Sequence, residues 1–147
     1  MTSFFGKTAV AGIGATEFSK ESGRTELQLA LEACKAALDD AGIHPSEVDG
    51  FTSYYQDTSP SIDVARGLGC ENIRHFSMID FGGGAAAATI AHAAMAVATG
   101  AAEVVLAYRA FNERSGARFG AALNVDSWGV DARAANYAWY LPHGLCL

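Results

Sequence analysis

The sequence has few cysteines and few basic residues, and neither kind is grouped. Its three cysteines, at positions 34, 70 and 146, form no CxxC and no Cys/His metal-binding spacing. This pattern indicates neither a disulfide framework nor a metal site, and it is typical of a reducing compartment, so we expect a cytoplasmic protein. The 10 Lys and Arg residues are scattered, and the net charge is −6. Nucleic-acid binding, which needs a clustered basic face, is therefore not expected.

Formal charge is missing altogether from residues 81–102. This run is long enough for a membrane span. Its hydrophobicity per residue is low, however, because it is mostly Ala and Gly and includes Thr89, His92 and Thr99. A helix that is apolar on every side is also typical of the centre of a large soluble protein. We therefore predict a buried helix here and no membrane span.

Apolar material is plentiful, since 50% of the 147 residues are hydrophobic. That length fits one domain, or a fragment of a larger one. Segments with the pattern of short buried strands alternate with helical segments, which indicates an α/β layered fold with a largely parallel sheet. The predicted strands cover residues 8–11, 51–55, 75–79 and 103–108, and the predicted helices cover residues 25–41, 62–68 and 85–99.

The segment after Thr25 carries the clearest helix signals. Thr25 and Gln28 have the spacing of a capping box, in which each side chain accepts a hydrogen bond from the other residue's backbone N–H. Apolar residues then recur at helical spacing up to Ala41, and Gly42 is typical of the residue that ends a helix. Cys34 falls on the apolar face, so we predict a core thiol there.

We interpret the polar side chains in and near the uncharged run as structural residues. His75 begins a predicted strand and His92 lies on the predicted buried helix, and each is predicted to be a hydrogen-bonded core histidine. Asp80 directly precedes the sequence Phe81-Gly82-Gly83-Gly84 and is predicted to cap the helix that follows. Among the tyrosines, nothing in the sequence distinguishes a proton-transfer group.

Four segments, in order along the chain, resemble the N-terminal half of a thiolase-superfamily subunit of the lipid-transfer-protein or sterol-carrier type. They are residues 10–18 with the turn Gly12-Ile13-Gly14, residues 29–43, residues 46–50 and residues 98–106. The resemblance implies a thiolase-like layered fold with a mostly parallel sheet and a buried central helix. We expect residues 1–147 to form one N-terminal thiolase-like domain, truncated at its C-terminal end.

The same resemblance places Phe81 where active thiolases carry their reactive cysteine. A helix N-terminus stabilises a thiolate at that position through the helix dipole and free N–H groups. A phenyl ring can neither attack a thioester nor transfer a proton. The superfamily's other catalytic groups belong to a half that this chain does not contain. No catalytic residue is therefore assigned, and a covalent acyl intermediate is not expected.

One branch of these proteins lacks the nucleophile and cleaves a carbon–carbon bond of steroid side-chain CoA thioesters by retro-aldol chemistry, with a small DUF35-like OB-fold partner. A retro-aldolase needs a base for a hydroxyl proton and stabilisation of the departing enolate. On this interpretation Gly82 and Gly83 supply backbone N–H groups and Phe81 forms a wall for an apolar substrate. These three are the predicted substrate-binding residues. Alternatively, the glycines only allow the helix to pack closely on the sheet.

Three functions stay open at this point. The first is a steroid side-chain CoA retro-aldolase subunit, the second an acetyl-CoA acyltransferase (thiolase) relative, and the third a non-catalytic lipid or CoA-thioester binding module. A CoA thioester is the substrate or ligand, and we expect no cofactor and no metal. The resemblance also implies a homodimer in which the strand 75–79 pairs with its copy in the second subunit.

Overall fold

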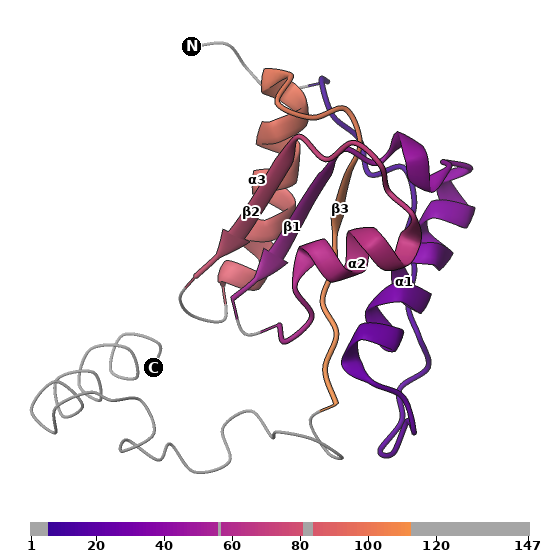
Figure 1. Ribbon diagram of the computed structural model, residues 1–147. Helices are drawn as coiled ribbons and strands as arrows, with labels where there is room; N and C mark the ends of the chain where they lie inside the picture. The colour runs from indigo at the N-terminus through magenta and orange to yellow at the C-terminus, as the bar shows by residue number, and fades with distance from the viewer. Residues whose placement is uncertain (1–5, 56, 81–83, 113–147) are drawn as a thin grey trace, which may run out of the picture.

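A computed structural model describes residues 6–55, 57–80 and 84–112, which form an α/β unit (Figure 1). In chain order the elements are α1 (Glu26–Ala41), a 3-10 turn η1 (Pro45–Glu47), β1 (Gly50–Tyr54), α2 (Ser61–Leu68), β2 (His75–Ile79), α3 (Ala85–Thr99) and β3 (Val105–Ala107). The strands form one parallel sheet in the order β2-β1-β3. The predicted α/β class with a parallel sheet is confirmed for this part of the chain.

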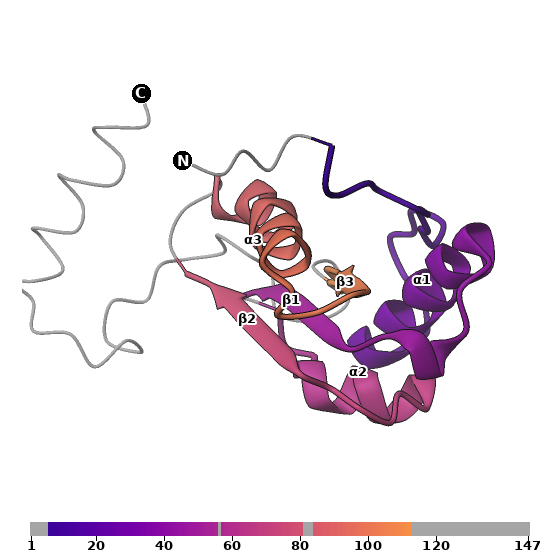
Figure 2. The ribbon, with the colours of Figure 1, turned by 90° about the horizontal axis from the view of Figure 1, so that it is seen from above.

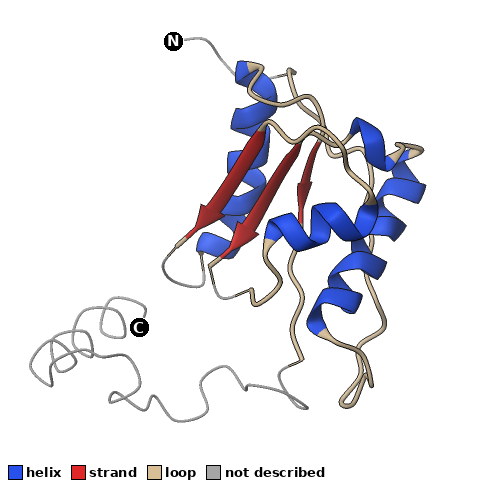
Figure 3. Cartoon of the chain, in the orientation of Figure 1, coloured by secondary structure: helices blue, strands red, loops and turns tan. Residues whose placement is uncertain are grey.

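The sheet lies between helices on its two faces (Figures 1 and 2). On one face α2 packs against β1 and α1 lies beside α2, while α3 covers the other face and contacts all three strands. The main core lies on the side of α1 and α2, and Phe51 and Val64 are fully buried in it. Figure 3 shows the three arrows pointing the same way, so that all three strands end at one edge of the sheet.

The predicted ends of α1 are confirmed. Gln28 N donates to Thr25 Oγ1 at 3.1 Å, and Thr25 N donates to Gln28 Oε1 at 2.8 Å. Gly42 closes the helix with a left-handed backbone, φ 67°. Cys34 is buried in the main core, as predicted, because it lies on the apolar face of this helix.

The strand predicted over residues 8–11 is not formed, and residues 8–19 have no regular secondary structure. This segment packs on α1 instead. A Cβ at Gly14 would overlap the carbonyl oxygen of Ala33, so the two backbones are in direct contact. Ile13 N also donates to Asp40 Oδ2 at 2.9 Å. A cavity of about 600 Å³ is lined by this segment together with α1, α3 and β3.

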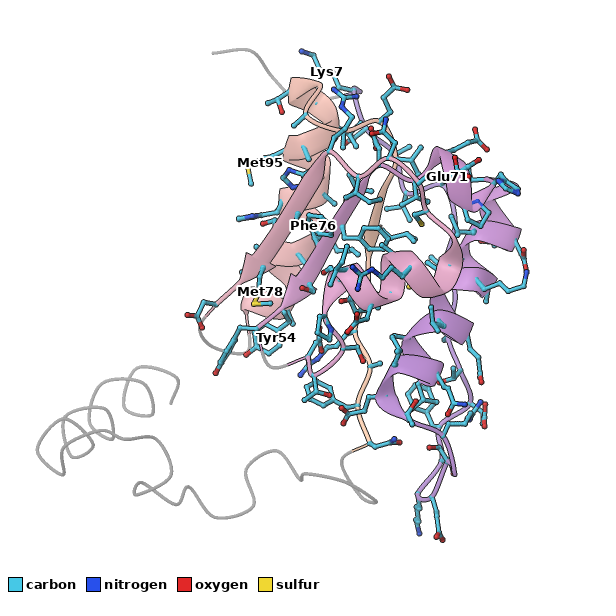
Figure 4. The ribbon with its side chains drawn as sticks, viewed as in Figure 1. Lys7, Tyr54, Glu71, Phe76, Met78 and Met95 are labelled. Carbon is cyan, nitrogen blue, oxygen red and sulfur yellow. The ribbon has the colours of Figure 1, made fainter. Side chains whose placement is uncertain are left out.

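The helix α3 is less buried than its composition predicts. Thr89 and Ala96 are buried, but Ile90 and Met95 are 52% and 39% exposed. Figure 4 shows Met95 pointing away from the ribbon. Within the described residues α3 has a sheet on one side only, so burial on every side is not observed. None of the helices in the described ranges is long and apolar enough to cross a membrane.

Candidate functional site

The ends of the three strands and the start of α3 meet at one edge of the sheet, which we call the carboxyl edge. Tyr54, Ile79 and Ala107 are the last residues of β1, β2 and β3, and α3 begins at Ala85. Ligand sites of open parallel α/β sheets lie outside the carboxyl ends of the strands. The junction singled out by the sequence therefore lies at the edge where a ligand site is expected.

The predicted substrate-binding residues Phe81, Gly82 and Gly83 lie outside the described residues, and their role stays a prediction. Gly84 is described, and it is the N-cap of α3 with φ −67°. No described atom lies within 4 Å of a Cβ built on Gly84. Among the described residues, close packing does not require glycine at position 84, and the packing alternative for Gly82 and Gly83 stays untested.

The prediction that Asp80 caps α3 is also wrong. The N-cap is Gly84, four residues later, and within the described ranges no side-chain capping hydrogen bond to α3 is found. The first turn of α3 contains no acidic residue. The start of a helix offers backbone N–H groups and the positive end of the helix dipole, an arrangement that favours a negatively charged ligand group.

Tyr54 links the ends of β1 and β2 to α3. Tyr54 is buried in a small cluster with Ile79, and Ala88 in the first turns of α3 packs against this cluster. The rings of Tyr54 and Tyr55 pack edge to face, with their centroids 4.9 Å apart. Burial raises the pKa of the Tyr54 phenol, and the neighbouring Tyr55 and the Asp80 carboxyl act in the same direction. Figure 4 shows Tyr54 at the end of its strand.

Tyr108 has a different role, because it fixes the loop between β1 and α2. Its hydroxyl donates to Ser59 O at 2.6 Å and lies 3.2 Å from Ser61 Oγ. Burial raises the pKa of the Tyr108 phenol as well. The bonds of this hydroxyl to the loop indicate a structural tyrosine. Tyr137 and Tyr140 lie outside the described residues.

The pair of Asp57 and Arg109 is a feature of the carboxyl edge that sequence reasoning missed. Arg109 Nε lies 3.8 Å from Asp57 Oδ1, and the two side chains are 43% and 1% exposed, respectively. The guanidinium carbon lies 4.9 Å from the ring centroid of Tyr54 and 4.6 Å from that of Phe111. A charged residue shortly after each of two strands is the signal that could have indicated this pair.

Asp57 also closes the turn that follows β1. Its backbone N–H donates to Tyr54 O at 2.9 Å, and its Oδ2 accepts from Tyr54 N at 3.1 Å. Burial raises the pKa of the Asp57 carboxyl, and this effect exceeds the opposing effects of the Tyr54 N–H and Arg109. Asp57 therefore joins the end of β1 to the residues that follow β3.

The histidines and cysteines of the described ranges lie apart from the carboxyl edge. His92 Nδ1 lies 2.9 Å from Ser77 Oγ, which confirms a hydrogen-bonded histidine between α3 and β2. His75 begins β2 at the opposite edge, and its buried Nε2 has no hydrogen-bond partner among the described residues, so the hydrogen bonding predicted for His75 stays a prediction. Burial raises the pKa of the Cys34 thiol to about 12. No cluster of His, Cys, Asp and Glu suited to a metal ion occurs in the described ranges.

Comparison with known proteins gives two similar curated sequences, although no protein-family profile matches the chain. It is 57% identical over 140 residues to a steroid side-chain-cleaving aldolase from Thermomonospora curvata. It is 56% identical over 145 residues to a 17-hydroxy-3-oxo-4-pregnene-20-carboxyl-CoA lyase from Mycobacterium tuberculosis. Each alignment covers 95% of this chain and 36% of the relative, so the chain spans about a third of the relatives' length.

Solved structures give the same picture. An Ltp2-ChsH2(DUF35) aldolase has a TM-score of 0.75 and 56% identity, covering 93% of this chain and 33% of that one. A monomeric SCP2-thiolase like protein type 1 from Mycobacterium smegmatis has a TM-score of 0.54 and 28% identity, covering 66% and 22%. A priming β-ketosynthase from the R1128 polyketide pathway has a TM-score of 0.51 and 25% identity, covering 63% and 30%. These structural similarities confirm the thiolase-like fold. They also support a relationship to the SCP2-type thiolase superfamily.

Proposed function

We propose that this chain is the N-terminal part of a steroid side-chain CoA retro-aldolase, a carbon–carbon lyase that uses no cysteine nucleophile. The observation that carries the proposal is the identity of 57% and 56%, over 95% of the chain, to two proteins whose names state such a cleavage. The TM-score of 0.75 to an aldolase structure supports it.

The proposed reaction needs only proton transfer and charge stabilisation. A base removes the proton of a hydroxyl group on the carbon β to the thioester carbonyl. The oxygen forms a C=O bond, the adjacent carbon–carbon bond breaks, and its electron pair passes to the carbon next to the thioester. Protonation of the resulting enolate gives a ketone and a shorter acyl-CoA. Neither a thiolate nor a redox partner takes part, so a phenylalanine at position 81 is compatible with the chemistry, and our expectation of no cofactor is unchanged.

The start of α3 supports the placement of the enolate at the carboxyl edge. Developing negative charge is stabilised by preorganised N–H donors at a helix N-terminus. The described part of this N-terminus has neither a capping side chain nor an acidic residue in its first turn. Phe81, Gly82 and Gly83 remain the predicted substrate-binding residues, with the two glycines as N–H donors and the phenyl ring as a pocket wall.

A DUF35-type OB-fold protein is the proposed partner. The support is the solved Ltp2-ChsH2(DUF35) aldolase, whose name joins an aldolase of 56% identity to such a protein. The proposed substrate is a steroid-CoA thioester, in keeping with the name of the lyase from Mycobacterium tuberculosis. The alignment covers only 36% of the mycobacterial lyase. The substrate and the partner are therefore proposed for a whole protein of that length.

We also propose a homodimer that pairs β2 with its copy. Within the described residues β2 is at an edge of the sheet. Its outward side chains Phe76 and Met78 are 50% and 62% exposed, as expected for a strand that is covered in an assembly. Met78→Lys should shift the protein from dimer to monomer in sedimentation equilibrium. A monomer for the unmodified protein would contradict the dimer.

The experiment that tests the proposed activity is co-expression of the chain, from its full reading frame, with a DUF35-type OB-fold protein. The purified complex is incubated with a steroid-CoA thioester that carries a β-hydroxyl group, and the products are identified by mass spectrometry. We expect a steroid ketone and a shorter acyl-CoA in equal amounts, and neither product from the OB-fold protein alone. Thioester binding without any product would contradict the proposal.

A further inference from the structure

Arg109 makes contacts that lead from β3 to the start of α3. Its guanidinium lies over the Tyr54 ring, and Tyr54 forms a small buried cluster with Ile79, against which Ala88 packs. Ile79 is the last residue of β2, and Ala88 lies in the first turns of α3. Arg109 thus acts, through one tyrosine, on the elements that precede and follow the junction at the carboxyl edge.

These contacts require the shape of a guanidinium group. A planar guanidinium can stack on aromatic rings and pair with a carboxylate at the same time, which a lysine ammonium does less well. Arg109 does both, between Tyr54 and Phe111 and beside Asp57. Burying the Asp57 carboxyl costs free energy, and Oδ1 has no hydrogen-bond partner among the described residues. The positive charge of Arg109 reduces this cost. The Asp57–Arg109 pair therefore differs from an ion pair between two exposed side chains.

An exposed pair on α2 shows the difference. Arg66 Nη1 lies 3.9 Å from Asp63 Oδ1, almost the same separation, but the side chains are 76% and 44% exposed. Among the described residues Arg66 has no aromatic ring against its guanidinium, whereas Arg109 has two. Arg66 is therefore a matched control for the loss of one arginine and one ion pair away from α3.

We propose that Arg109 is a positioning residue of the candidate site: held by Asp57, it keeps Tyr54 in the buried cluster on which Ala88 packs and so fixes the start of α3. The inference rests on the proposed function, which places the enolate at that N-terminus. Arg109 acts through Tyr54 and need not touch the substrate. Its loss should disturb the geometry of the N–H groups, and with it the stabilisation of the transition state.

A first test measures the order of α3 without any turnover. Hydrogen exchange, read by mass spectrometry, is compared for Arg109→Gln, Arg109→Lys and the control Arg66→Gln. We expect amides in the first turns of α3 to exchange about tenfold faster in Arg109→Gln, less so in Arg109→Lys, and unchanged in Arg66→Gln. A peptide from α1 serves as the reference, since a variant that misfolds would exchange faster there too. Unchanged exchange at the start of α3 in both Arg109 variants would overturn the proposal.

A second test uses the assembled enzyme with its OB-fold partner. Arg109→Gln should lower kcat about tenfold or more with a small change in KM, and millimolar guanidinium ion should restore part of the activity of Arg109→Ala. Full activity in Arg109→Gln would overturn the positioning role. If the unmodified enzyme cleaves no steroid thioester, the proposed function fails, and the exchange comparison still decides whether Arg109 fixes the start of α3.

Discussion

The carboxylate of Asp49 accepts a hydrogen bond of 2.9 Å from the backbone N–H of Val104 and so joins the segment before β1 to the segment before β3. Its two oxygens also accept from Glu103 N, at 2.8 and 3.0 Å. At the other end of the same strands, Asp57 pairs with Arg109. Two aspartates therefore hold β1 and β3 together at both ends. This matters because β3 has only three residues and, in the part of the chain that the structure describes, pairs with β1 alone.

Replacement of Asp49 tests the first of these connections. Asp49→Ala leaves the N–H groups of Glu103 and Val104 without their acceptor, and we expect a loss of about 2–3 kcal/mol in the free energy of unfolding. Asp49→Asn keeps one acceptor oxygen and should lose about half as much. Urea unfolding measures both values. A loss below about 0.5 kcal/mol in Asp49→Ala would show that β3 does not depend on this carboxylate.

The Asp57 carboxyl predicts a specific pH dependence of stability. Because burial raises its pKa above the ordinary value of 3.8, the folded protein keeps the proton to higher pH than the unfolded chain does. Between these two pKa values the folded state binds more protons, so the free energy of unfolding falls as the pH rises. Asp57→Asn lacks this contribution. The stability of the unmodified protein relative to Asp57→Asn should thus fall with rising pH in this window, and a rise there would contradict the account.

The Cys34 thiol should be unreactive in the folded protein. With a pKa of about 12 and a buried side chain, it has almost no thiolate at neutral pH. We expect iodoacetamide to modify the half-buried Cys70 before Cys34, and to modify Cys34 only after unfolding, as peptide mapping would show. Modification of Cys34 at the rate of a free thiol in the native protein would contradict its placement in the core.

Substitution by alanine should have opposite effects on stability at Gly84 and at Gly14. Gly84 has a helical φ of −67° and no described atom within 4 Å of an added Cβ, so Gly84→Ala should leave stability unchanged or raise it by about 0.4–1 kcal/mol. A Cβ at Gly14 would overlap the backbone of α1, and Gly14→Ala should lose about 1–3 kcal/mol. Thermal unfolding compares the two. Equal losses would mean that α3 also needs a glycine at its N-cap.

Local signals allowed several elements to be predicted closely from the sequence. The bounds of β2 and α3 agree with the predicted 75–79 and 85–99, because glycines and a change in charge mark their ends. The capping box and Gly42 likewise defined α1. These signals lie within a few residues of the element that they delimit, so a single sequence contains them in full.

Features that depend on distant partners could not be predicted. The strand expected over 103–108 is formed only over Val105–Ala107. The backbone N–H groups of Glu103 and Val104 donate to the Asp49 carboxylate instead of to a neighbouring strand. The strand expected over 8–11 packs on α1 instead of joining the sheet. The Asp57–Arg109 pair joins two loops whose proximity follows from the pairing of β1 with β3. The roles of Phe81, Gly82 and Gly83 rest on the resemblance and are still predictions.

The most direct test of the central claim, carbon–carbon cleavage without a cysteine nucleophile, is the CoA dependence of product formation. Retro-aldol cleavage of a β-hydroxy steroid-CoA consumes no CoA, whereas thiolysis transfers an acyl group to free CoA. The rate of ketone release by the complex with the OB-fold partner is measured with and without added CoA. We predict the same rate in both, and no acyl adduct on the protein by intact mass. Product formation only when CoA is added, together with a stoichiometric acyl-cysteine, would contradict the account.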